Sequence, residues 1–126
     1  MRPKNVGVVN GRLQPCPGTP NCVCSFDTDD EHGIAPLKFA GPWETARERL
    51  LTVVSSQPRT RIVVDDGQYL RIECTSLILR FVDDLEFLFD PTAQVIHVRS
   101  ASRVGRSDLG VNRNRVETIR RLFEQA

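Results

Sequence analysis

The sequence has few aromatic residues, almost no net charge and no long apolar run. It contains only six Phe, one Trp and one Tyr, and its formal net charge is +1. So weak a positive field and so few rings for base stacking make nucleic acid a poor candidate partner. No apolar run approaches the roughly 20 residues of a membrane span, and the N-terminus shows no apolar core of a secretory leader. We therefore expect no membrane span and, by default, a soluble cytoplasmic protein.

The rest of the composition is that of an ordinary globular domain, with 40% apolar and 26% charged residues. A chain of this length can bury roughly two-thirds of the surface that its unfolded form exposes. Five of the eight prolines and three of the four cysteines fall in residues 1–39, which show no apolar periodicity. We expect an irregular Pro/Cys-rich arm over residues 1–39, packed on a domain formed by residues 40–126.

Hydrophobic periodicity predicts the order helix, four strands, helix for residues 40–126. Apolar residues recur at helical spacing from Pro42 to about Ser56, and again after Gly110. Between them the period changes to two, and Asp66-Gly67 is typical of a hairpin turn. The segments predicted as strands are residues 62–65, 69–75, 79–89 and 95–99. The resulting fold class is α+β, with a single four-stranded antiparallel sheet, both helices on its dry face and a wet face opposite.

Positive charge is concentrated near the C-terminus, where seven arginines lie between Arg99 and Arg121 against only Asp108 and Glu117. This excess falls on a glycine-bearing loop and on the start of the last predicted helix, where the macrodipole is already positive. A phosphate, sulfate or carboxylate bound there would compensate the charge. The candidate ligand-binding residues lie in this segment and in the third predicted strand: Arg99, Ser100, Ser102, Arg103, Arg106, Asp108, Asn112, Arg113, Asp83 and Asp84.

The same arginines have a structural interpretation. Carboxylates of Asp83, Asp84, Glu86 or Asp108 would pair with them internally and hold the loop, as guanidinium groups often do in partly buried networks. The adjacent acids Asp83 and Asp84 also suggest a catalytic pair. Neighbouring residues of a strand point to opposite faces, however, so the two would share one proton only at a β-bulge. We expect one to face the wet side and the other to anchor an arginine.

The cysteines leave two interpretations open. Three thiols at Cys16, Cys22 and Cys24, followed by His32, match a zinc ligand set on paper, but no paired C-x-x-C is present and no metal site is predicted. A disulfide between Cys16 and Cys22 is the candidate in an oxidising compartment, and free thiols are expected in a reducing one. Cys74 alternates in phase with core residues of its strand and is interpreted as apolar packing. No nucleotide-binding motif is present, and no cofactor is predicted.

Three separated segments carry a family resemblance: Cys16–Val23, Phe81–Phe87 and Arg99–Gly105, the last continuing through Arg115. Together they resemble the family called domain of unknown function 1499, over nearly all of the chain from Leu13 onward. The resemblance implies a protein of unknown function. Exported or membrane-associated forms among such relatives would suit a disulfide between Cys16 and Cys22. Cys24 stands where the family typically has a serine.

We retain three functional hypotheses. The first is a non-enzymatic domain that binds a small anionic molecule or an acidic partner at the arginine-rich loop. The second is a small hydrolase or transferase that uses Asp83 or Asp84 as base, with arginine stabilisation. The third is an assembly module in which the arginines are paired internally and an exposed strand edge or the arm meets a protein partner. Whether the protein is an enzyme, and what its oligomeric state is, both remain open.

Overall fold

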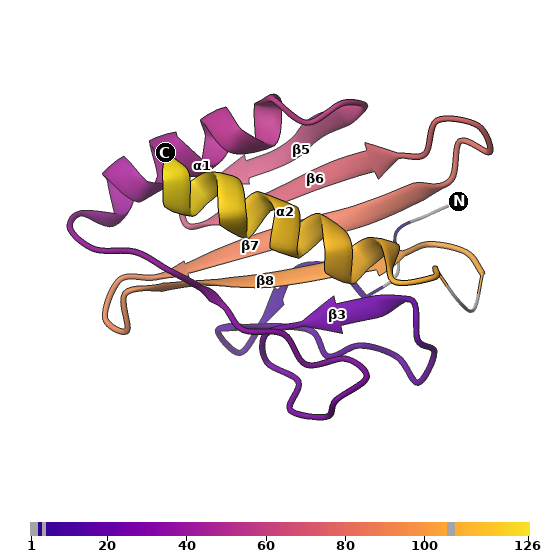
Figure 1. The fold of residues 1–126 in the computed structure, drawn as a ribbon. Helices are drawn as coiled ribbons and strands as arrows, with labels where there is room; N and C mark the ends of the chain where they lie inside the picture. The colour runs from indigo at the N-terminus through magenta and orange to yellow at the C-terminus, as the bar shows by residue number, and fades with distance from the viewer. Residues whose placement is uncertain (1–2, 4, 106–107) are drawn as a thin grey trace.

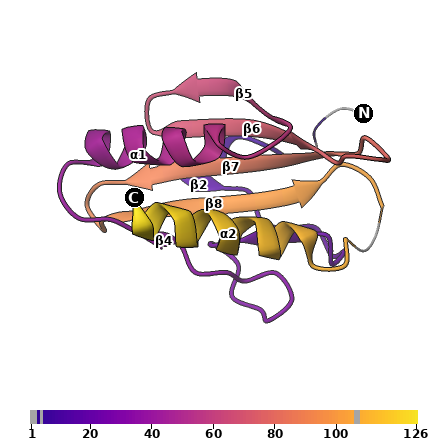
Figure 2. The same cartoon turned by 45° about the horizontal axis from the view of Figure 1, so that its top comes forward.

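A six-stranded antiparallel sheet with two helices on one face dominates the structure, a computed structural model that describes residues 3, 5–105 and 108–126 (Figure 1). The helices are α1 (Trp43–Ser55) and α2 (Val111–Gln125), and they lie side by side across the sheet. A separate hairpin of β1 (Val8–Val9) and β2 (Arg12–Leu13) lies behind the sheet, on the face away from the helices (Figure 2). The sheet is therefore covered on both faces.

The main sheet has the order β3-β8-β7-β6-β5, and β4 also pairs with β8. All of these pairings are antiparallel. The strands are β3 (Cys22–Cys24), β4 (Leu37–Lys38), β5 (Thr60–Asp66), β6 (Tyr69–Thr75), β7 (Val82–Asp90) and β8 (Val95–Ser102). The long strands β5 to β8 form a meander, as expected when each strand pairs with the next along the chain.

The prediction of a single four-stranded sheet is wrong, and so is the order helix, four strands, helix. Four short strands precede α1, and two of them extend the main sheet beyond β8: Cys22 pairs with Ala101, and Leu37 with Ile96. The arm is thus not wholly irregular. These strands escaped prediction because each has only two or three residues, too few to show a period, and pairs with a distant part of the chain. The α+β class, the antiparallel sheet and the two helices are confirmed.

The core lies between the helices and the sheet. Alternate residues of the strands point toward the helices, and both helices bury one apolar stripe against them. The fully buried side chains include Leu50 of α1, Ile119 of α2 and Phe87 of β7. Cys74 belongs to this cluster at 4% exposure, as its position in the alternation predicts. The apolar stripes of the sequence thus place both helices on the same face.

The opposite face of the sheet is not wet, because the N-terminal segment buries its centre. Glu86 and Arg99 are 0% and 1% exposed and form an ion pair, with 3.3 Å between Glu86 Oε1 and Arg99 Nη1. Glu86 Oε2 accepts hydrogen bonds from the Tyr69 hydroxyl at 2.6 Å and from the Gly7 backbone N–H at 2.8 Å. Burial and the hydrogen bond to Glu86 raise the pKa of Tyr69. Leu13, 2% exposed, adds apolar cover.

Two local features hold the arm. Cys16 and Cys22 are joined by a disulfide bond, with 5.7 Å between their Cα atoms. His32 has its Nδ1 2.7 Å from Asp29 Oδ2 and its Nε2 2.9 Å from the Thr19 carbonyl oxygen. Burial alone would lower the pKa of His32, but the hydrogen bonds to Thr19 and Asp29 outweigh it and raise that pKa. Two oxygen acceptors suit a ring that is protonated on both nitrogens. Among the described residues, no three His, Cys, Asp or Glu side chains are placed to hold a metal ion.

Candidate functional site

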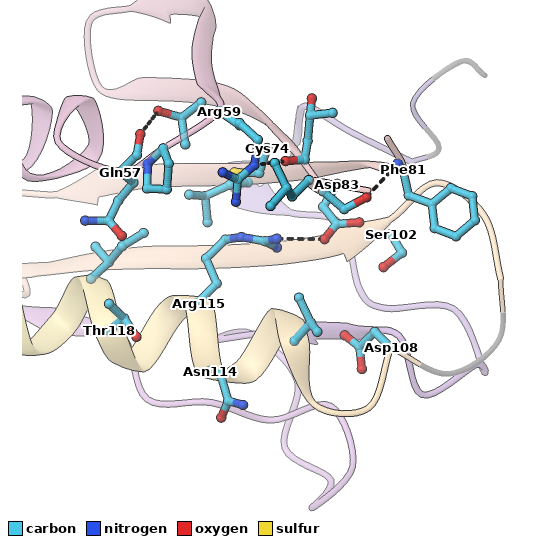
Figure 3. Close-up of a pocket in the computed structure, with 18 of the residues that line it drawn as sticks. Gln57, Arg59, Cys74, Phe81, Asp83, Ser102, Asp108, Asn114, Arg115 and Thr118 are labelled. Carbon is cyan, nitrogen blue, oxygen red and sulfur yellow. Dashed lines mark hydrogen bonds and ion pairs between the residues drawn. The ribbon is translucent and has the colours of Figure 1, made fainter. Parts of the chain in front are cut away.

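A cavity of about 600 Å³ opens between the start of α2, the end of α1 and one end of strands β6 to β8 (Figure 3). We call it the pocket. Its inner wall includes Val54 of α1, Leu85 of β7 and Ile119 of α2, all of them core side chains. Its mouth includes Phe81 and Leu109. Cavities of roughly 300–1,000 Å³ with mainly apolar walls are typical of small-molecule sites.

One ion pair lies in the wall of the pocket. Arg115 reaches from α2 toward the sheet and places its Nη2 2.8 Å from Oδ2 of Asp83 on β7 (Figure 3). The two side chains are 20% and 11% exposed, so they are largely withdrawn from bulk water. Ser102, on the neighbouring strand β8, is the register partner of Asp83 and also lines the pocket. Charge and a hydroxyl group therefore occur on one side of a cavity whose deeper wall is apolar.

The Arg115 side chain is held from behind by Asn112, which is 0% exposed. Arg115 Nη1 donates to Asn112 Oδ1 at 2.8 Å and to Ser100 Oγ at 3.1 Å. The Ser100 hydroxyl donates to the same Asn112 Oδ1 at 2.6 Å. Asn112 Nδ2 donates to Ser102 Oγ at 2.9 Å and to Asp108 Oδ2 at 2.7 Å. We call these residues, together with Asp83, the Asn112 network; it fixes the guanidinium group before any ligand arrives.

The local sequence explains why α2 begins at this point. Asp108 accepts hydrogen bonds from the backbone N–H groups of Gly110 and Asn112, both at 2.9 Å, and so satisfies donors that a helix start leaves unpaired. Burial alone would raise the pKa of Asp108, but the hydrogen bonds from Asn112 and Gly110 lower it. Gly110 has φ +81°, a conformation that favours glycine. An anionic Asp108 also suits the positive end of the helix dipole.

The predicted site residues divide between the two faces of the sheet. Those on the helix side belong to the Asn112 network: Asp83, Ser100, Ser102, Asp108 and Asn112. On the opposite face, Arg103 places its Nε 2.8 Å from Asp84 Oδ2 and its Nη2 2.7 Å from Glu73 Oε2, while Arg99 pairs with Glu86. Arg113 donates from Nη2 to the Glu31 carbonyl oxygen at 3.2 Å, on the arm. Arg106 lies outside the described residues.

Asp83 and Asp84 point to opposite faces of β7, as strand alternation requires. Asp83 faces α2, whereas Asp84 meets Arg103 and also Arg71, whose Nη1 lies 2.8 Å from Asp84 Oδ1. Only Asp83 of the two lines the pocket. The pair therefore does not act on one shared atom, and a catalytic role for Asp83 stays a prediction.

Sequence reasoning did not include the residues that make the pocket a cavity. Arg115 is not among the ligand-binding residues predicted from the sequence, although it lies three positions after Asn112, one helical turn along the same face. Leu77 and Leu109 line the pocket and are 66% and 91% exposed. Apolar residues in a polar loop could have indicated these two lining residues. Loop residues show no helical or strand periodicity, however, so the sequence does not tell which way their side chains point. Cys74 also lines the pocket, and burial raises its pKa to about 11.

The fold and the pocket define a small α+β domain with a ligand-sized cavity at the start of its last helix. The chain belongs to the family described as protein of unknown function (DUF1499), whose family model matches residues 12–123. The resemblance of the three sequence segments is thereby confirmed. No curated protein and no solved structure matches the chain. Among the described residues, no helix is long and apolar enough to cross a membrane.

Proposed function

We propose that the pocket binds a small amphiphilic molecule, with its apolar body against the core side chains and its polar group against Arg115. One observation carries this proposal: a preorganised ion pair lies in the wall of an open cavity whose inner wall is apolar. The volume of about 600 Å³ suits a ligand of this kind. An apolar body would gain roughly 25 cal/mol for each Å² that it removes from water.

The hydrogen-bond pattern of Arg115 favours a head group that accepts hydrogen bonds. A guanidinium group has five N–H donors. Contacts with Ser100, Asn112 and Asp83 use three of them, which leaves two for a ligand. Arg59 also lines the pocket and, with Arg115, balances the carboxylates of Asp83 and Asp108, so the free guanidinium donors, and not an excess of positive charge, favour an acceptor head group. We therefore expect a carboxylate or phosphate head to bind better than an alcohol, and an alcohol better than an amine.

Like the first hypothesis drawn from the sequence, this proposal has an anionic ligand, but it places the ligand at a different site. The recognising arginine is Arg115, supported by the Asn112 network, in place of Arg99 and Arg103, which pair with acids on the other face of the sheet. The enzyme hypothesis shares the pocket through Asp83. The enzyme hypothesis predicts that an added ester or phosphoester is hydrolysed, whereas the binding proposal predicts no hydrolysis.

A thermal-shift comparison of head groups tests the proposal. Decanoate, decyl phosphate, decanol and decylamine share one apolar body and differ in the polar group. A ligand present at 100 times its Kd adds about 2.7 kcal/mol, which raises Tm by roughly 10 °C in a domain of this size. We expect the largest shifts from decanoate and decyl phosphate, and we expect Arg115→Met to abolish the difference between head groups. Equal shifts for all four compounds, or none, would contradict the proposal.

A further inference from the structure

Exposed apolar side chains gather around the mouth of the pocket. Six of the nine large apolar residues that are exposed in the described part of the chain lie there: Leu77, Ile78, Leu79, Phe81, Leu109 and Val111. We call this set the apolar rim. Its most exposed members, Leu109 and Ile78, are 91% and 84% accessible. Single exposed apolar residues are common on proteins, but a cluster of six marks a surface that contacts something apolar.

The apolar rim is formed by two loops on opposite sides of the pocket. Leu77 and Phe81 lie between β6 and β7, while Leu109 and Val111 lie at the start of α2, and all four line the pocket. In Figure 3 the labelled Phe81 and Asp108 lie at one end of the pocket. Arg115 and Thr118 line it further in. Apolar side chains therefore lead from the rim into the pocket and to its inner wall, beside the ion pair of Arg115 and Asp83.

Among the described residues, two arginines and one carboxylate, that of Asp108 next to Leu109, border the apolar rim. Arg80 is exposed and stands in the chain between Leu79 and Phe81, and Arg59 is exposed at the pocket. The segment from Ser76 to Phe81 contains no acidic residue. Arginine flanking exposed apolar side chains is typical of surfaces that enter a lipid interface, because the guanidinium group stays at the headgroup level while the apolar residues insert.

We propose that the apolar rim inserts into the surface of a bilayer that contains anionic lipid, so that the pocket opens toward the lipid. A specific protein partner needs a shape-matched surface of about 800 Å² on each side. A bilayer surface has no fixed shape to match, so apolar side chains that project from two separate loops can insert into it. This inference goes beyond binding of an amphiphile and does not depend on it, because insertion needs exposed apolar side chains and not an occupied cavity, and Ile78 and Leu79 of the rim do not line the pocket.

The charge of the chain sets the salt dependence of this docking. With a net charge of +1 and two arginines at the rim, electrostatic attraction is weaker than for a polybasic anchor. Apolar insertion supplies most of the affinity, so raising the ionic strength should weaken binding only a few-fold. A protein held by charge alone would be released completely.

Sedimentation with sucrose-loaded vesicles of phosphatidylglycerol and phosphatidylcholine tests the inference. Ile78→Asp places a charge at the rim, and Val9→Asp is the matched control, because Val9 is 53% exposed on the separate hairpin behind the sheet. We expect the wild type to sediment with vesicles, Ile78→Asp to lower the partition coefficient at least about tenfold, and Val9→Asp to stay within about twofold. Trp43 fluorescence checks that each variant is folded.

Three outcomes would overturn the inference: no sedimentation of the wild type, equal partitioning of Ile78→Asp and the wild type, or equal losses in Ile78→Asp and Val9→Asp. Analytical ultracentrifugation covers the alternative of self-association; a dimer that Ile78→Asp dissociates, with no vesicle binding, would assign the apolar rim to a second copy of the chain. Arg115→Met separates the two proposals, since it should lose the preference for acidic head groups and keep vesicle binding.

Discussion

The Asn112 network makes a quantitative prediction about stability. Asn112 is 0% exposed, and its amide contacts Ser100, Ser102, Asp108 and Arg115 at 2.6–2.9 Å. Two of these partners are charged, and hydrogen bonds to charged groups contribute about 1.5–3 kcal/mol each. Arg115 and Ser100 still contact each other when Asn112 is removed, which offsets part of the loss. We therefore expect Asn112→Ala to lower the free energy of unfolding by about 3–5 kcal/mol.

Urea denaturation followed by fluorescence of Trp43, the only tryptophan of the chain, measures this loss. Trp43 packs near Phe89 with ring centroids 5.8 Å apart, so its environment changes on unfolding. With an m-value near 2 kcal/mol/M, the midpoint should fall by roughly 2 M. Asn114→Ala is the control, because Asn114 is exposed on the same helix and should change stability by less than about 0.5 kcal/mol.

A loss below about 1 kcal/mol for Asn112→Ala would refute the reasoning, since it would mean that the network does not hold α2 against the sheet. Equal losses for Asn112→Ala and Asn114→Ala would also refute it, because they would assign the effect to helix propensity. Neither result would bear on whether the pocket binds a ligand.

Three further predictions concern the arm and the buried face that it covers. Reducing the disulfide between Cys16 and Cys22 should lower the free energy of unfolding by about 2 kcal/mol, the value for a short closed loop, as measured in urea with and without reductant. The pKa of His32 is raised above 6.5, so the stability that protonated His32 contributes is fully present below pH 6.5 and is lost as the pH rises through the raised value. His32→Gln should therefore flatten the pH dependence of the urea midpoint in this range. An unchanged pH dependence in the variant would contradict the prediction. Arg99→Met should cost about 3–5 kcal/mol because it leaves Glu86 charged and buried, and the double variant with Glu86→Gln should lose less than the sum of the two single variants.

The long elements could be predicted from sequence because their patterns are local. A hairpin was predicted at Asp66-Gly67, and β5 and β6 do form one, with Gly67 and Gln68 as the turn residues; the helix predicted from Pro42 to about Ser56 is found at Trp43–Ser55. In both cases neighbouring residues carry the signal, since a turn type or a helical stripe needs only a few consecutive positions. Strand alternation likewise placed Asp83 and Asp84 on opposite faces of β7.

The short strands and the buried polar face depend on contacts between distant residues. Nothing near Cys22 indicates that it pairs with Ala101. Glu86 and Arg99 look like solvent-facing residues of two alternating strands, and only the covering segment near Gly7 and Leu13 makes them a buried pair. A pattern within one strand reports which residues share a face, but it does not report whether another segment covers that face.

The candidate site could be predicted only in part, because its residues meet through contacts between distant parts of the chain. Ser100 is predicted from its hydroxyl beside the arginines, Asp108 as an acid near them, and Asn112 from the family resemblance, and the structure joins all three in one network. The arginines were selected by charge alone, and charge does not indicate on which face of a strand a side chain lies. Arg103 is therefore predicted to bind the ligand, whereas in the structure it pairs with Asp84 on the far face of the sheet.

The central claim is that the pocket is a binding site. Isothermal titration of decanoate into the wild type and into Thr118→Trp tests this claim most directly. Thr118 lines the pocket from α2, so an indole there would fill the cavity without removing any member of the Asn112 network. Arg121→Trp is the control for bulk, because Arg121 is exposed on the same helix. We predict one site per chain, at least about tenfold weaker binding to Thr118→Trp, and unchanged binding to Arg121→Trp. Equal affinity for all three proteins, or no heat of binding to the wild type, would contradict the claim.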